Sequence, residues 1–177
     1  MAGKPDRAKR FVFCSCSAVW TKQRGCGLRP LQSAMKGWGH NVSLQHYGLV
    51  VNPSCPWLGA SHNRLVYDPE KLTYGVLEVK CPHSLRDSEP YFVKSHDFYL
   101  TFNEDEEPYL NRDQQYYAQV LGQMALTDCQ WADFVVYSKN WIAMERIWFD
   151  EEEWLHVKSN LDSFYLRHML PYLVRRV

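Results

Sequence analysis

Short stretches of alternating apolar and polar residues predict the strands of a sheet. Residues 61–67 and 74–81 follow the period of two typical of strands, and Asp68-Pro69 lies between them, so they are expected to form a hairpin. The second arm stops at Pro82, which has no N–H to donate to a ladder. Three further strands are expected at 49–51, 131–137 and 142–149, with a turn at Lys139-Asn140 between the last two.

Two segments show helical spacing instead. Within 112–126, apolar residues recur at steps of three and four, which predicts a helix despite Gly122. A second helix is expected to begin after Asp150, because Glu153 completes a capping box, and to run to Leu170, before Pro171. Trp154 and Tyr165 share faces of this helix with leucines, which favours packing in the core.

The predicted elements belong to one mixed α+β domain, a central mixed sheet flanked by helices. Residues 1–45 mix Gly, Ser, Cys and basic residues without a sustained period, so we separate them as a basic amino-terminal segment from a domain over 46–177. The stretch between Pro82 and Pro108 is also expected to be irregular.

Composition narrows the class of protein. With 177 residues and 46% hydrophobic content, the chain can bury a core. No apolar run approaches the roughly 18 residues of a spanning helix, and the start lacks a secretory pattern. We therefore expect an intracellular protein, nuclear or cytoplasmic, that is not secreted and has no membrane partner. The six cysteines, without regular spacing, are expected to be reduced.

The formal net charge of zero conceals an uneven distribution. Residues 1–67 hold nine of the 20 Lys and Arg but only one acid, Asp6. A basic region of this kind is either an electrostatic footprint for nucleic acid or a solvated tail. Charge alone favours the tail.

Glu78 and Lys80 carry the candidate chemistry. Side chains alternate along a strand, so both charges point to one face of 74–81, while Leu77 and Val79 point to the other. Phosphodiester cleavage uses such a pair, since a carboxylate holds Mg²⁺ and an ammonium orients or activates the attacking water. Two solvated charges on a half-buried strand are the simpler interpretation of this short pattern by itself.

The surrounding sequence favours the catalytic interpretation of Glu78 and Lys80 over two solvated charges. Five runs follow one another along the chain: Gly-Leu-Val-Val-Asn-Pro at 48–53, Pro-Trp-Leu-Gly-Ala-Ser at 56–61, Leu-Val-Tyr-Asp-Pro at 65–69, Leu-Glu-Val-Lys-Cys-Pro at 77–82 and Tyr-Tyr-Ala-Gln-Val-Leu-Gly-Gln-Met at 116–124. Together they resemble the YqaJ type of viral recombinase, in the lambda-exonuclease branch of the PD-(D/E)XK nucleases.

The resemblance implies a restriction-endonuclease-like fold and a deoxyribonuclease, often an exonuclease, that acts on DNA in recombination or repair with Mg²⁺ or Mn²⁺. It is compatible with an oligomer but does not fix the oligomeric state. By position, Glu78 would be a metal ligand, Lys80 the group that orients or activates water, and Gln119 the active-site glutamine. Ser61, Gln115 and Gln123 would be substrate-binding residues.

The chain departs from the family where the second ligand belongs. Asn63 stands in place of the family's aspartate, and an amide oxygen is a weaker, less selective ligand for Mg²⁺. Between Arg7 and Tyr67 there is no acid to serve as the family's upstream carboxylate, so the domain is expected to be incomplete on its amino-terminal side. Either another residue or chain completes the site, or the protein is a catalytically inactive DNA-binding or scaffold module.

Neighbouring residues offer weak substitutes. His62 is expected to be a surface loop residue rather than a ligand, because Mg²⁺ prefers oxygen donors, and Asp68 a turn residue before Pro69. Cys14, Cys16 and Cys26 resemble part of a zinc-finger pattern, but Leu28 occupies the fourth position and only His40 is near. Three ligands do not close a structural zinc site, so none is expected.

Overall fold

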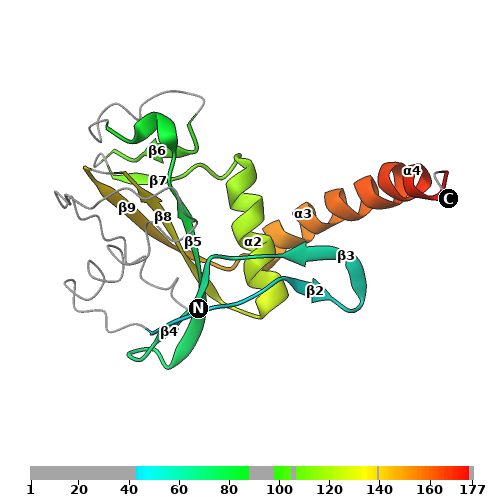
Figure 1. Ribbon diagram of the computed structural model, residues 1–177, viewed down its shortest axis with the longest axis horizontal. Helices are drawn as coiled ribbons and strands as arrows, with labels where there is room; N and C mark the ends of the chain where they lie inside the picture. Colours follow the sequence, from blue (N-terminus) through cyan, green and yellow to red (C-terminus); the bar gives the residue numbers. More distant parts are fainter. Residues whose placement is uncertain (1–42, 88–97, 105–106, 139, 176–177) are drawn as a thin grey trace.

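The centre of the protein is a five-stranded mixed sheet, as expected (Figure 1). The computed structural model describes residues 43–87, 98–104, 107–138 and 140–175. The strand order is β1-β4-β5-β8-β9, and only β5 and β8 run parallel. The strands are β1 Ser43–Gln45, β4 Arg64–Asp68, β5 Thr73–Lys80, β8 Trp131–Tyr137 and β9 Ile142–Trp148.

Two small hairpins join this sheet, and neither was predicted as a pair. They consist of β2 Val50–Asn52 with β3 Cys55–Ala60, and β6 Leu100–Phe102 with β7 Pro108–Leu110. The strand expected at 49–51 is confirmed as β2, whereas β6 and β7 have three residues each, too few to show a period. β3 contains Pro56, which is tolerated because β3 pairs only with β2 in a two-stranded hairpin.

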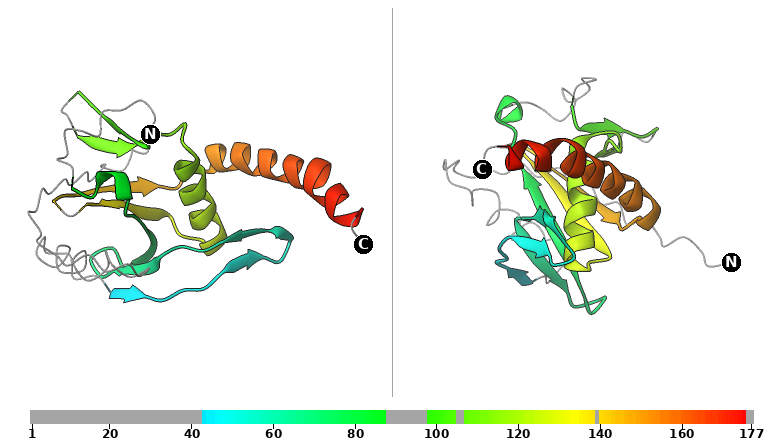
Figure 2. Two further views of the ribbon diagram at one scale, coloured as in Figure 1. Left: turned by 45° about the horizontal axis from the view of Figure 1, so that its top comes forward. Right: turned by 90° about the vertical axis from the view of Figure 1, so that its right-hand side faces the viewer.

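Helix α2, Gln115–Thr127, lies across one face of the sheet and buries the predicted apolar stripe (Figure 2). That stripe is Tyr117, Val120, Leu121 and Met124. Gly122 faces the next helix, and a Cβ there would lie 3.4 Å from the Trp154 ring, at the near edge of ordinary contact. α2 and the next helix therefore pack closely at this point.

The sheet separates two apolar clusters. Val76 packs with α2 on one face, whereas Leu77 packs with Val66 and Trp131 on the other. Asp68 lies beside the second cluster and does more than close a turn: its carboxylate accepts from Glu70 N and Lys71 N and also from Arg146 at 2.9 Å.

The carboxy-terminal helix is longer and more exposed than expected. α3 spans Glu151–Phe164, and Asp150 caps it by accepting from Glu153 N at 3.1 Å, which confirms the predicted start of the helix and the Asp150 half of the capping box. The helix continues through a π turn, Tyr165–Met169, into α4, Leu170–Val174, so the predicted end before Pro171 was wrong. Leu170 N already bonds to Tyr165 O, five residues back, so the bonding register shifts just ahead of the proline.

This helix extends away from the sheet (Figures 1 and 2). Trp154 is half-buried against α2, but the expected core packing of Tyr165 was wrong, because Tyr165 stacks instead on Trp57 of β3 at 5.1 Å. Within the described ranges, no helix combines the length and apolar character needed to cross a membrane.

Candidate active site

Glu78 and Lys80 project together from β5 toward α2, as the strand period predicted. Lys80 Nζ lies 2.8 Å from Glu78 Oε1. Glu78 is only 6% exposed, whereas the Lys80 side chain reaches further toward solvent. A carboxylate this buried requires paired donors to offset its lost hydration.

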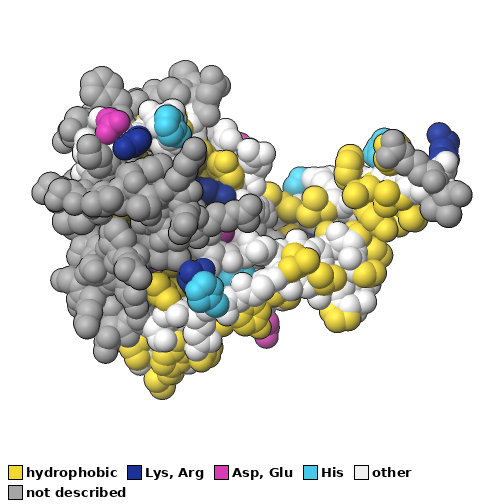
Figure 3. Space-filling model, in the orientation of Figure 1, with side chains coloured by type: hydrophobic (Ala, Val, Ile, Leu, Met, Phe, Trp, Pro, Cys, Tyr) yellow, Lys and Arg dark blue, Asp and Glu magenta, His cyan; other side chains and the backbone are white. Residues whose placement is uncertain are grey.

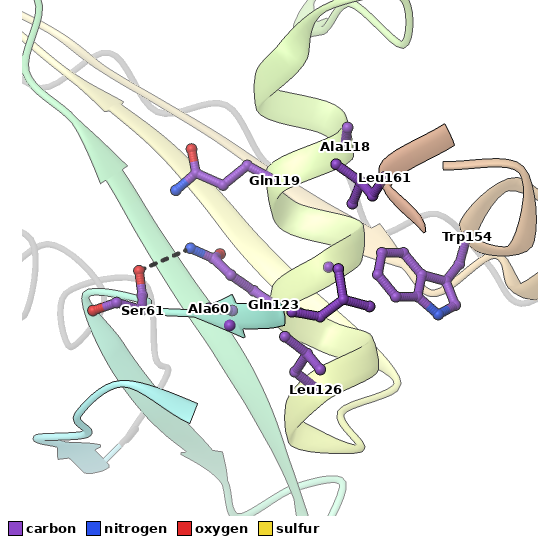
Figure 4. Close-up of a pocket in the computed structure, with 11 residues that line it drawn as sticks. Ala60, Ser61, Ala118, Gln119, Gln123, Leu126, Trp154 and Leu161 are labelled. Carbon is purple, nitrogen blue, oxygen red and sulfur yellow. Dashed lines mark hydrogen bonds between the residues drawn. The ribbon is translucent and has the colours of Figure 1, made fainter. Parts of the chain in front are cut away.

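Two glutamines of α2 supply the remaining donors. Gln119 Nε2 donates to Glu78 Oε1 at 3.0 Å, and Gln123 Nε2 donates to Glu78 Oε2 at 2.9 Å. Their four-residue spacing puts both amides on the same side of α2, facing β5 (Figure 4). Both carboxylate oxygens of Glu78 are therefore held by protein donors.

Lys80 is fixed by more than its ion pair. Its ammonium also donates to Gln119 Oε1 at 3.0 Å and lies 4.1 Å from the centroid of the Tyr116 ring. Tyr116 is a contact that the sequence interpretation did not assign, although the residue lies within the quoted run at 116–124. Its position beside Lys80 depends on how α2 packs on the sheet.

Asn63 lies beside Glu78 but performs a backbone task. Its N–H donates to Leu77 O at 3.1 Å, and its Oδ1 accepts from Val79 N at 2.7 Å. β4 begins only at Arg64, so the side chain of Asn63 replaces the missing ladder partner of Val79. The one oxygen of the amide is thus committed, and its NH₂ group stands where an aspartate would have a second oxygen.

His62 was expected at the surface, and that prediction was wrong. It is 4% exposed and stacks on Tyr47 with ring centroids 5.2 Å apart. Burial lowers the pKa of His62, against an opposing effect of Glu78. The prediction failed because Tyr47, which lies 15 positions earlier in the chain, stacks on the His62 ring. No local sequence pattern indicates that contact.

Of the three candidate substrate-binding residues, Ser61 and Gln123 lie at the Glu78 cluster and Gln115 lies at the surface. Ser61 contributes its main-chain carbonyl, which accepts from Gln123 Nε2 at 3.3 Å, while its side chain is exposed. Gln115 is exposed on the first turn of α2, and no hydrogen bond between described residues joins it to Glu78. Substrate-binding roles for Ser61, Gln115 and Gln123 stay predictions.

A cavity of about 260 Å³ adjoins this cluster between β3, α2 and α3 (Figure 4). Gln119 and Gln123 line it on the side of Glu78, and Leu58, Trp154 and Leu161 give it apolar walls. It could not be anticipated from the sequence, because its walls come from three elements and β3 was not predicted.

Comparison with known proteins identifies the family. Residues 35–130, more than half of the chain, match the family described as the YqaJ-like viral recombinase domain. The chain belongs to this family. No curated protein matches it.

Two solved structures share this fold with the YqaJ-like domain. The crystal structure of LHK-Exo in complex with dAMP is 27% identical, with a TM-score of 0.57 over 87% of this chain and 72% of that one. The alkaline exonuclease LHK-Exo from Laribacter hongkongensis gives 23% identity and a TM-score of 0.55 over 85% of this chain and 70% of that one. The restriction-endonuclease-like fold expected from the sequence is confirmed.

The YqaJ resemblance implies a divalent metal, and Glu78 fits that role. Glu78 Oε1 and Gln119 Oε1 both accept from the Lys80 ammonium, so two oxygens already converge on a cation, and oxygen donors are those that Mg²⁺ prefers. Asn63 is the weaker ligand, because it offers a single neutral oxygen, which already accepts from Val79 N, and its NH₂ group cannot bind a cation. Within the described ranges, no three His, Cys, Asp or Glu side chains gather into a metal-binding group.

Proposed function

We propose that this YqaJ-like domain is a metal-dependent deoxyribonuclease of the exonuclease type, with a reaction centre formed by Glu78, Lys80 and Gln119. The observation that carries the proposal is the bonded cluster of these three side chains on one face of the sheet. The likeness to an alkaline exonuclease supports it.

Each residue has a defined task in this proposal. Mg²⁺ or Mn²⁺ bound at Glu78 would polarise the scissile phosphate and favour ionisation of the attacking water. Lys80, held by Glu78 and Gln119, orients that water and offsets charge on the phosphate. Gln123 acts as a positioning residue, because it holds the second oxygen of Glu78.

The setting follows from the family and the sequence. DNA is the proposed substrate, and recombination or repair the proposed process. The chain would act inside the cell, in the nucleus or cytoplasm. The basic residues within 1–67 would supply attraction to phosphates that does not depend on base sequence.

A second candidate is a DNA-binding module that no longer cuts, and the geometry of Asn63 favours it. With its oxygen committed to Val79 N, Asn63 offers an amide NH₂ rather than a second anionic oxygen. Glu78 alone would hold a divalent ion weakly. In this case, DNA binding would be sensitive to salt and independent of Mg²⁺.

A cleavage and binding assay on linear duplex DNA separates the candidates. We expect Mg²⁺- or Mn²⁺-dependent cleavage that falls about a hundredfold or more in Glu78→Gln and in Lys80→Ala. The control is Glu70→Gln, an exposed acid in the turn before β5, which should cut like the native chain. Binding without cleavage by the native chain selects the second candidate, and equal cleavage by all variants contradicts the first.

A further inference from the structure

Lys80 makes a contact to which the proposed reaction gives no task. Besides its bonds to Glu78 and Gln119, its ammonium lies 4.1 Å from the centroid of the Tyr116 ring. A cation over the face of an aromatic ring is attracted by the negative potential of that face. The Lys80 side chain is only 18% exposed, so water competes little with this attraction. Tyr116 is therefore a third group that holds the ammonium, and it carries no charge.

The three groups that hold Lys80 differ in how they respond to a metal ion. Glu78 is also the proposed metal ligand. Once its carboxylate binds a divalent ion, its attraction for the ammonium falls and the two cations repel each other. The attraction of the Tyr116 ring does not depend on the charge of Glu78. Tyr116 is thus the contact that can keep Lys80 in position when the carboxylate is occupied.

The Tyr116 ring is itself supported by other aromatic rings. Tyr116 lies in the first turn of α2, and Tyr99, directly before β6, packs against it at 82° with the centroids 4.9 Å apart. Tyr99 in turn lies at 90° to Phe134 of β8, at 6.1 Å. Perpendicular rings with centroids about 4.5–7 Å apart attract each other. Phe134 is almost fully buried, so this row of rings joins Lys80 to the core.

Tyr99 contributes its ring rather than its hydroxyl group. The hydroxyl is buried and forms no hydrogen bond with any residue in the described ranges. The backbone of Tyr99 is fixed by Asn111, whose N–H donates to Tyr99 O at 2.8 Å. Asn111 directly follows β7, so the β6–β7 hairpin sets the position of the ring that supports Tyr116.

The position of Lys80 matters because few described cations could replace it. Arg112 pairs with Glu145 at 2.7 Å. Arg146 pairs with Asp133 at 2.8 Å. On the face of the molecule shown in Figure 3, Lys and Arg side chains are sparse among the described residues. A displaced ammonium at Lys80 would therefore leave little positive charge for the phosphate.

We propose that Tyr116 is a positioning residue of the reaction centre, whose ring holds the Lys80 ammonium beside Glu78 through a cation–π contact. Tyr99 holds that ring in its orientation. The effect on cleavage rests on the proposed nuclease function. The contact itself is a property of the folded chain, so it can be measured without activity.

The first test is an NMR measurement on the full chain, free of DNA. Protons over an aromatic face resonate upfield, so we expect an upfield shift of the Lys80 ε-methylene protons. Tyr116→Phe should keep this shift, and Tyr116→Leu should abolish it. Glu78→Gln should also keep it, because the ring still holds the ammonium when position 78 carries no charge.

Fluorination of the ring separates the cation–π contact from simple packing. Phenylalanine analogues with one, two or three ring fluorines nearly keep the shape of the ring, but the negative potential of its face falls with each fluorine. At position 116 they should lower the kcat of metal-dependent cleavage stepwise, by about threefold to thirtyfold over the series, with KM unchanged.

The matched control is the same series at position 117. Tyr117 lies on the same helix, and its ring faces the guanidinium of Arg112 at 4.6 Å. Fluorination there weakens a cation–π contact of the same kind outside the reaction centre. We expect kcat to stay the same across the control series.

Three outcomes would overturn the proposal. The first is a native chain whose Lys80 ε-methylene protons have ordinary chemical shifts. The second is an upfield shift that disappears in Glu78→Gln, since the carboxylate alone would then hold Lys80. The third is a native chain that cuts DNA with a kcat that does not change with fluorination at position 116. If the native chain does not cut DNA, the nuclease proposal fails, and the shifts in the native chain and in Glu78→Gln decide whether Tyr116 positions Lys80.

Discussion

Asn63 stabilises the backbone of β5, but it supplies no carboxylate to the proposed metal site. Its Oδ1 satisfies the N–H of Val79 at 2.7 Å, at a point where β4 has not yet begun. We expect Asn63→Ala to lower the free energy of unfolding by about 1–3 kcal/mol, because it leaves a partly buried N–H without an acceptor. Urea unfolding measures this. Asn63→Asp is the matched control, since either oxygen of aspartate can accept the same bond; an equal loss in both variants contradicts the assignment.

Asp68 gives the fold a predictable response to acid. Burial raises the pKa of its carboxyl, but the hydrogen bond and charge of Arg146 outweigh it and hold the pKa below its usual range. A folded-state pKa below the unfolded value means stability that is present above about pH 4 and lost as the pH falls through the folded value.

Asp68→Asn removes that dependence. We expect it to cost about 2 kcal/mol at neutral pH, since a hydrogen bond to a charged partner is lost. We also expect the variant to lose less stability than the native chain between neutral and acidic pH. Unfolding by urea at a series of pH values measures both effects. Parallel acid profiles for the two proteins would contradict this role of Asp68.

The elements differ in how far the sequence could predict them. β4, β5, β8 and β9 were all predicted, and the period of two along β5 placed Glu78 and Lys80 on one face. β2 was also predicted, at 49–51, but β1, β6 and β7 were missed, because strands of three residues are too short to show a period. The hydrogen bond from Gln123 to Glu78 joins residues 45 positions apart, so it depends on helix packing that no local pattern contains.

The contact between Gly75 of β5 and Trp131 of β8 predicts the effect of a larger side chain at position 75. A Cβ at Gly75 would lie 2.3 Å from the Trp131 indole, which is itself almost fully buried. Gly75→Ala should therefore lower the free energy of unfolding by about 1–3 kcal/mol through overpacking. Gly48→Ala is the control, because a Cβ there meets nothing within 4 Å. Melting temperatures compare the two; similar values would show that Trp131 can move aside.

Across the whole molecule, the charge separation found in the sequence should govern affinity for DNA. Eight of the nine basic residues within 1–67 precede residue 43 and so lie outside the described residues. Cys14, Cys16, Cys26 and His40 also lie outside them. Their role stays a prediction. If they contact phosphates, replacing Lys4, Arg7, Lys9 and Arg10 by serine should lower the salt slope of duplex binding by up to about four. Fluorescence anisotropy over a salt series measures it, and an unchanged slope would assign these residues to a solvated tail.

The most direct test of the account restores the aspartate at Asn63 and measures cleavage of end-labelled linear duplex in Mg²⁺ or Mn²⁺. The account predicts that Asn63→Asp cuts at least tenfold faster than the native chain, because a second anionic oxygen then joins Glu78 beside Lys80 and Gln119. It also predicts that adding Glu78→Gln to Asn63→Asp abolishes the gain. No gain from Asn63→Asp, or a gain that survives Glu78→Gln, would contradict the claim that Glu78, Lys80 and Gln119 form the reaction centre.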